Sequence, residues 1–261
     1  MQATAPGYSA CPKCGHAPLP ADQSLPASCP ACGLIFAKYG APPPPRVVAG
    51  PDEDGPIAGR WRNLIALIRH VPEKSDATDV WIRAVLLAVF VLWGVRMMAY
   101  DFRVGDINSS FLHGPLLVFH EAGHVIFMPF GEFVTIAGGT LGQLIMPMVL
   151  CGALLYTNRD PFGAAIGLWL FGVSLLDVAP YAYDALHPQL TLLGGHTGEE
   201  GGHDWIFLLR STHLLGRAQG IGWFIHKLGV AVLLLSFYWA GWVLWQQRKR
   251  AQLANGSEEN A

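Results

Sequence analysis

Two histidines and a glutamate in the segment His120-Glu121-Ala122-Gly123-His124 have the types and spacing of a metal site. Residues four apart on a helix project from the same face, so both imidazoles can bind one ion. Zinc suits this pattern, since it lowers the pKa of a bound water toward neutrality. The Glu121 carboxylate can then take the proton of that water during attack on a carbonyl and pass it to a leaving amine. The motif therefore predicts peptide hydrolysis, with Glu121 as the general base.

The surroundings of the motif strengthen this prediction, because it interrupts the apolar run LLVFHEAGHVIFMPF. Ionisable groups inside a membrane span are costly unless they are paired, bound to metal or facing water. Three of them at metal-ligand spacing favour a metal site over a buried polar cluster. His113 stands seven residues before His120 and near the same face, and we expect it to support the site rather than to bind the ion.

A second group of metal-binding residues occupies the N-terminal region, where two Cys-Pro-x-Cys-Gly turns occur. Each turn places two thiolates close together, and two such turns complete a tetrahedral site for a structural zinc ion. We therefore predict a zinc ribbon over residues 1–39, folded by its metal, with a role in docking partners as an added hypothesis. The four ligands are Cys11, Cys14, Cys29 and Cys32. The fifth cysteine, Cys151, lies in an apolar run and is expected to be a buried thiol.

The elements that must position the first motif are apolar segments. Hydrophobic residues make up 52% of the chain and charged residues only 14%, a balance that favours a membrane protein. Apolar runs near the ~20 residues that cross a bilayer recur at 80–100, 108–130, 139–157, 161–182 and 221–245. The sequence thus predicts an all-α polytopic membrane protein with about five transmembrane helices, and a transmembrane domain over residues 80–246.

Three further segments complete the predicted organisation. Residues 40–59 are rich in Pro and Gly and predict a linker, and 60–79 predict an amphipathic juxtamembrane segment. Residues 247–261 predict a polar C-terminal tail. The formal charge of −2 and the lack of a basic stripe give no reason to expect a nucleic-acid partner.

The orientation follows from basic residues and from the first residues of the chain. MQATAPGYSA lacks the features of a secretory signal, and the basic residues before the first apolar run favour a cytosolic N-terminus. Five spans would then put Arg248, Lys249 and Arg250 outside, against the usual bias. Either the bias fails at this end or the count is wrong by one span, most simply at 130–142 or 205–215.

A catalytic zinc site needs a third protein ligand and leaves one position open to water. Asp177 and Asp184 flank Pro180, which is expected to break the fourth span and to turn carboxylates inward. The Gly-rich loop that follows offers further groups that could bind a metal or form a lid. These groups are His196, Glu199, Glu200, His203 and Asp204.

Over about residues 108–190 the chain resembles the site-2 protease class of intramembrane zinc metallopeptidases, the M50 group, in its HExxH motif and its later Pro-linked aspartates. In that family a Pro-containing segment ending in Asp-Gly supplies the third ligand, and Asp184-Ala185 is the similar pair here. The resemblance implies that His120, His124 and Asp184 hold the catalytic zinc, with Asp177 or His203 as alternatives to Asp184.

The resemblance also bears on residues 131–147, which look like the family's short re-entrant β-hairpin. Such a hairpin would offer a strand edge to an extended peptide. The glycines Gly138, Gly139 and Gly142 would equally suit close helix packing, and both interpretations stay open. Gln143 is a candidate for contact with the substrate.

The leading hypothesis is therefore an intramembrane zinc metalloprotease that cuts membrane-bound or membrane-proximal protein substrates. It would lie in a bacterial inner membrane, with its ribbon and active site toward the cytosol. The alternative is a non-proteolytic adaptor whose ribbon recruits a cytosolic partner. Zinc transport ranks last, since it would need further histidines or acids within several spans.

Overall fold

The structure is a computed structural model that describes residues 9–19, 28–36, 56–71 and 77–258. The chain divides into two compact units, Met1–Arg60 and Trp61–Ala261. Of the predicted linker 40–59, residues 40–55 lie outside the described residues, and the rest begins a helix. Part of the predicted juxtamembrane segment, 72–76, also lies outside them.

The regular elements of the described residues are helices. Their bounds are α1 Pro56–Ile68, α2 Ala77–Ala99, α3 His113–Phe127, α4 Glu132–Tyr156, α5 Pro161–Asp184, α6 Asp204–Ser211 and α7 Ala218–Glu258. Short 3-10 turns lie between α2 and α3, between α3 and α4, and on either side of α6. Within the described ranges there are isolated β-bridges but no strands. The predicted all-α class is thus confirmed.

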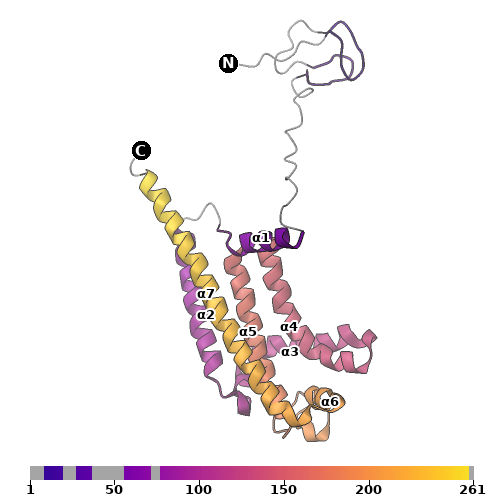
Figure 1. Cartoon of the computed structure of the whole chain (residues 1–261), viewed down its shortest axis with the longest axis vertical. Helices are drawn as coiled ribbons and strands as arrows, with labels where there is room; N and C mark the ends of the chain where they lie inside the picture. Colours follow the sequence, from indigo (N-terminus) through magenta and orange to yellow (C-terminus); the bar gives the residue numbers. More distant parts are fainter. Residues whose placement is uncertain (1–8, 20–27, 37–55, 72–76, 259–261) are drawn as a thin grey trace. The chain divides into compact units, whose positions relative to one another are not determined.

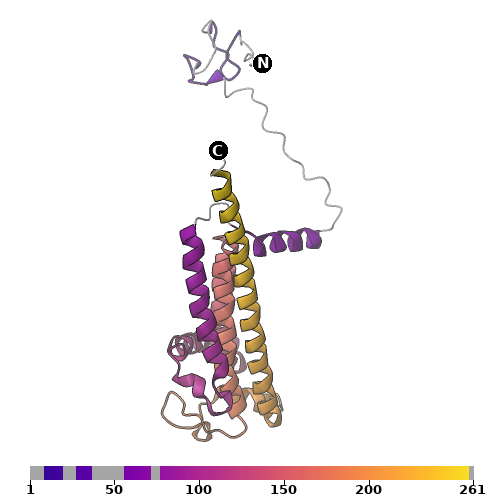
Figure 2. The same ribbon diagram turned by 90° about the vertical axis from the view of Figure 1, so that its left-hand side faces the viewer.

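Within the described part of the chain, four helical segments are long and apolar enough to cross a membrane: Ala77–Ala99, Glu132–Tyr156, Pro161–Asp184 and Leu215–Leu253. The predicted count of five was therefore wrong by one. The segment lost from the count is 108–130, which carries the HExxH motif, rather than either of the places suspected from the sequence. Its helix, α3, has 15 residues and spans about 22 Å, short of the ~30 Å of a bilayer core. Figures 1 and 2 show α3 lying across the direction of the long helices.

The β-hairpin interpretation of residues 131–147 is wrong, because they lie in α4. Instead, α3 and the first part of α4 pack side by side through glycines. A Cβ on Gly123 would clash with the carbonyl oxygen of Gly138, and a Cβ on Gly142 would lie 2.6 Å from the carbonyl oxygen of Phe119. The structure thus supports the close-packing alternative. Pro147 lies inside α4. Beyond its first part, α4 bends away from α3 and runs toward the start of α5 (Figure 1).

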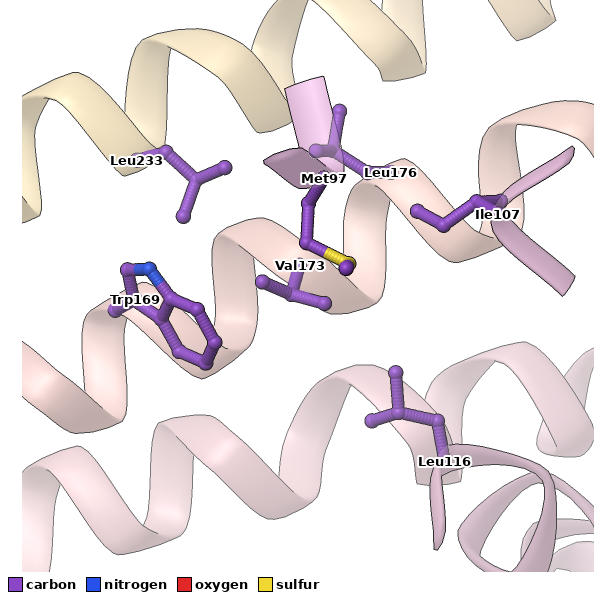
Figure 3. Close-up of a cluster of buried hydrophobic side chains, with 7 residues drawn as sticks. All are labelled: Met97, Ile107, Leu116, Trp169, Val173, Leu176 and Leu233. Atoms are coloured by element: carbon purple, nitrogen blue, oxygen red, sulfur yellow. The ribbon is translucent and has the colours of Figure 1, made fainter. Parts of the chain in front are cut away.

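The centre of the helical unit is α5, the most buried of the four long segments. Its residues Trp169, Val173 and Leu176 pack against Leu233 of α7 and Met97 of α2 (Figure 3). Since lipid is as apolar as these side chains, close packing rather than removal from water must hold the helices together. Contact between Gly172 and Gly229 backbones brings α5 and α7 together. This packing makes α5 a rigid support for the residues near its end.

At one end of this unit, α1 packs against the last turns of α4 and the first turns of α5. Leu64, Leu67 and Ile68 contact the cluster around the buried Cys151, as expected for that thiol. The indole of Trp239 donates to the carbonyl of Ile68 at 3.0 Å. The predicted tail 247–261 is helical up to Glu258, because α7 continues through it.

Candidate metal centres

The N-terminal unit brings its four cysteines together, as predicted. Their sulfur atoms lie within 4.8 Å of one another, with Cys11 to Cys32 at 3.7 Å and Cys14 to Cys29 at 3.8 Å. Sulfurs at about 2.3 Å from a tetrahedral zinc ion stand about 3.8 Å apart. The four thiols therefore fit the predicted ion in number, type and spacing.

The two cysteine turns share one backbone geometry. The amide of Gly15 donates to the carbonyl of Cys11 at 2.8 Å, and the amide of Gly33 donates to that of Cys29 at 2.8 Å. Both glycines have positive φ, +71° and +69°, which glycine adopts without a steric cost. The pKa of the Cys11 thiol reflects two opposed effects: burial disfavours the thiolate, but hydrogen bonds from backbone amides outweigh it and lower the pKa to about 6. Such a thiol is readily available as a thiolate ligand.

The second centre joins both motif histidines to an aspartate from the Gly-rich loop region. His120 and His124 lie one turn apart on α3, and Asp204 is the first residue of α6. The Asp204 Oδ2 atom lies 2.8 Å from His120 Nε2 and 3.2 Å from His124 Nε2. Ligand atoms at about 2.05 Å from a tetrahedral zinc ion stand about 3.3 Å apart. These three groups therefore have the spacing of a shared ion.

The other nitrogen of each imidazole is occupied in a way that leaves Nε2 available as a ligand. His124 Nδ1 lies 2.9 Å from the carbonyl oxygen of Thr135, which only accepts, so this nitrogen must carry the proton. His120 Nδ1 lies 3.3 Å from Gln143 Oε1 and donates in the same way. In a neutral imidazole, Nε2 then presents a lone pair. Two nitrogen lone pairs and a carboxylate therefore face one another, and a cation bound between them would relieve their repulsion.

Gly139 of α4 supplies the space for such a cation. A Cβ on this residue would lie 2.5 Å from His120 Nε2 and 2.5 Å from His124 Nε2, which is close to the place of a zinc ion bound to both. Only glycine leaves this volume free. The close approach of α3 and α4 therefore forms the floor of the centre as well as the helix contact.

A chain of hydrogen bonds supports His120 from behind. Gln143 Nε2 donates to Asp177 Oδ2 at 2.8 Å, which orients the amide so that its oxygen faces His120. His113 Nδ1 lies 2.9 Å from the other oxygen of Asp177. Asp177 and His113 are thus not among the grouped ligand atoms, in line with the supporting position expected of His113. Both polar ends of Gln143 are engaged, which leaves little for the substrate contact predicted from the sequence.

The grouped ligand atoms beside the two histidines do not include Asp184, which was predicted as the third ligand. Asp184, the predicted residue, accepts hydrogen bonds from the amides of Gln189 and Leu190 through Oδ1, at 2.8 and 3.2 Å. Its Oδ2 lies 3.4 Å from Nε2 of His203, the alternative ligand. Asp184 and His203 therefore hold the two ends of the loop that lies between them. Helix α5 also continues through Pro180 to Asp184, so the expected break in the span does not occur.

Asp204 takes the place beside the histidines because of its neighbours in the fold. Its backbone amide donates to the hydroxyl of Tyr181 at 3.0 Å, which ties the start of α6 to α5. His203 precedes it as the N-cap and accepts from the amide of Ile206 at 3.4 Å. Among the loop groups singled out from the sequence, only Asp204 joins the two histidines. The signal available in the sequence was an aspartate at the start of a helix, directly after His203, which lies beside Asp184.

A cavity of about 620 Å³ opens onto this centre. Glu121 lines it together with the three grouped residues, as the predicted general base must. One wall consists of residues 190–194, in a turn held by the Leu192 amide donating to the carbonyl of His196 at 2.8 Å. This volume lies in the range of ligand-binding pockets.

Comparison with known proteins gives no assignment. No protein family matches the sequence, and neither a characterised protein nor a solved structure shows significant similarity to the chain. The function must therefore be argued from the two centres themselves.

Proposed function

We propose that the chain is an integral membrane zinc metallopeptidase that resembles the site-2 protease class. The observation that supports it most directly is the meeting of His120, His124 and Asp204 around the space left by Gly139, with Glu121 in the same cavity. Three protein ligands and an open cavity are the pattern of a catalytic rather than a structural zinc site.

The residues divide the chemistry among themselves. A bound zinc ion would supply the Lewis acidity that activates water and polarises a carbonyl. Glu121 accepts the proton of the attacking water and delivers it to the amine that leaves. Asp177 and Gln143 hold the His120 ring in the tautomer that binds, and Thr135 does so for His124. Tyr181 holds the start of α6, which keeps the Asp204 carboxylate beside the histidines.

The proposal departs from the resemblance in one respect. The third ligand comes from the first residue of α6, after the loop that follows α5, and not from the Pro-containing segment within α5. The predicted Asp184 serves instead to accept backbone amides of that loop. The HExxH helix and the general base are unaffected by this exchange.

The test uses the purified full chain, its zinc content and a library of quenched fluorogenic peptides, together with a set of single-span membrane proteins as substrates. Glu121→Gln is expected to keep two zinc ions per chain and to lower cleavage by at least 10³-fold, because only the proton acceptor is lost. Asp106→Asn, which changes a carboxylate outside both centres, is the matched control and should cleave like the parent chain.

Two results would count against an enzyme. If Glu121→Gln cleaved at the parental rate, the assignment of the general base would be wrong. If the parent chain held a second zinc ion but cleaved none of the substrates, with no exchangeable water on the metal by spectroscopy of a cobalt-substituted form, the adaptor alternative would be favoured.

A further inference from the structure

The metal centre of the helical unit lies at one end of the long helices. The basic residues around α1 and at the end of α7 lie at the other end. Ala164, near the start of α5, packs in the cluster that contains α1 residues Leu64 and Ile68. Tyr181, which holds Asp204, lies 17 positions further along α5, or about 26 Å at the rise of an α-helix. Nearly the full thickness of a bilayer core therefore separates the two levels.

Helix α7 gives the same separation independently. Near its start, Gly222 packs against Tyr183, two positions after Tyr181. Near its other end, Arg250 donates to the carbonyl of Val71, just after α1, at 2.6 Å. These two positions stand 28 residues apart on one helix, about 42 Å. The arrangement is visible in Figure 1, where α6 and α1 lie at opposite ends of the bundle.

Lysines and arginines are more numerous at the α1 end than at the end with the metal centre. With four spans, the described residues 60–71, 77–83, 157–160 and 246–250 share one side of the membrane, and 96–132 and 185–227 share the other. Among the described residues, the α1 side has eight lysines and arginines, namely Arg60, Arg62, Arg69, Arg83, Arg159, Arg248, Lys249 and Arg250. The side of the metal centre has five, namely Arg96, Arg103, Arg210, Arg217 and Lys227. Short loops rich in lysine and arginine stay in the cytosol.

We infer that the metal centre of α3 and α6 opens on the extracytoplasmic side of the membrane, whereas α1 and the end of α7 lie on the cytosolic side. The triple Arg248-Lys249-Arg250, which broke the charge bias under five spans, obeys it under four. The cytosolic location predicted for the active site is thereby reversed. Resting on the proposed function, the inference also names the substrate class: a peptide segment that is exposed on the extracytoplasmic side or enters the outer half of the bilayer.

The outer surface of α3 agrees with a site at the membrane face. Val118, Val125 and Ile126 are each 65% exposed although they are apolar, which suits contact with lipid rather than with water. His120 on the same helix is buried beside its partners. A short helix with an apolar outer side and a polar inner side can hold the centre at the boundary between lipid and water.

The side of the membrane is measured by labelling single added cysteines in intact cells with a membrane-impermeant maleimide. Leu193→Cys, at the cavity wall and 73% exposed, and Val104→Cys, 64% exposed before α3, report on the side of the metal centre. Leu253→Cys, 76% exposed near the end of α7, reports on the other side. The parent chain gives the background of the five native cysteines.

Leu193→Cys and Val104→Cys are expected to label at least 10-fold above Leu253→Cys in intact cells, and all three alike after permeabilisation. The reverse order, or equal labelling before permeabilisation, would overturn the inference. Because labelling needs no catalysis, the Glu121→Gln form must give the same pattern. If the chain proves not to be a peptidase, the labelling still decides on which side the metal centre lies.

Discussion

At the scale of single residues, the centre depends on which aspartate reaches the metal and on the absence of one side chain. Three acidic groups near the end of α5 and the start of α6 have different partners: Asp177 faces Gln143 and His113, Asp184 faces loop amides, and Asp204 faces both histidines. Their separate environments allow separate tests.

Asp204→Asn is expected to lower zinc from two ions per chain to one, because an amide oxygen is a far weaker ligand than a carboxylate. Asp184→Asn is the matched comparison. It keeps an oxygen that accepts from the amides of Gln189 and Leu190, and should keep two zinc ions. Zinc analysis of the purified variants gives the answer. Loss of zinc from Asp184→Asn but not from Asp204→Asn would restore the ligand predicted from the sequence.

Gly139→Ala is expected to empty the histidine site, since the added methyl group would stand 2.5 Å from both Nε2 atoms. Zinc should fall to one ion per chain and cleavage to background. Gly152→Ala, in the same helix but with no atoms within 4 Å of its Cβ, is the control and should keep both ions. A fully loaded Gly139→Ala protein would show that the ion does not lie between the two histidines and α4.

The separation of two site residues along the chain decides whether their contact could be predicted from the sequence. His120 and His124 are four apart and share a helix, so their pairing follows from local geometry. Asp204 stands 84 positions from His120, and nothing local brings the two together. Its place follows from the Tyr181 hydroxyl and from the packing of α6, which a single sequence does not reveal. The role of Gly139 was equally hidden, since its glycine segment fitted a hairpin as well as a helix.

At the scale of elements, the short helix α3 explains both the wrong span count and the position of the centre. Residues 108–130 are apolar over a length that would span, but a 3-10 turn precedes the helix and Pro129 follows it. Pro129 has no N–H to continue the α-helical hydrogen bonds, so α3 gives way after Phe127 to a 3-10 turn, Met128–Phe130, which ends at Gly131. Apolar composition predicted helices that are long and apolar enough to cross a membrane, and these interruptions decide which of the apolar runs form such helices.

The contact between α3 and α4 depends on glycine at position 123. Gly123→Ala would force the Gly138 backbone away, and we expect a loss of roughly 1–3 kcal/mol, the usual range for overpacking. Gly114→Ala, in the same helix with open space around its Cβ, should leave stability unchanged or slightly higher. Thermal unfolding in detergent measures both. Equal midpoints for the two variants would show that α3 and α4 separate freely.

At the scale of the whole molecule, the two candidate metal sites belong to two separate compact units. The four-cysteine site was fully predictable, because its ligands lie within 22 positions and repeat one motif. The side of the membrane on which we infer the histidine site to lie was not predictable from the sequence, because that inference requires the number of spans. All nine tryptophans lie at or after Trp61, so tryptophan fluorescence reports on the helical unit alone.

The double variant Cys11→Ser, Cys14→Ser is expected to lose one of the two zinc ions, because two sulfurs do not hold a structural site. The unfolding midpoint followed by tryptophan fluorescence should stay within about a degree of the parent chain, since none of the nine tryptophans reports on the ribbon. Stripping both ions from the parent with a chelator should lower that midpoint. A drop of equal size in the double variant would indicate that the ribbon stabilises the membrane unit.

The origin of Asp204 in a late segment of the chain has a consequence for biosynthesis. A ribosome makes His120 and His124 well before Asp204, and α6 reaches them only after α4 and α5 have been inserted. A nascent chain therefore carries an incomplete binding site during most of its synthesis. Under the proposed function, cleavage could therefore begin only after Asp204 has been made and α6 has packed beside α3.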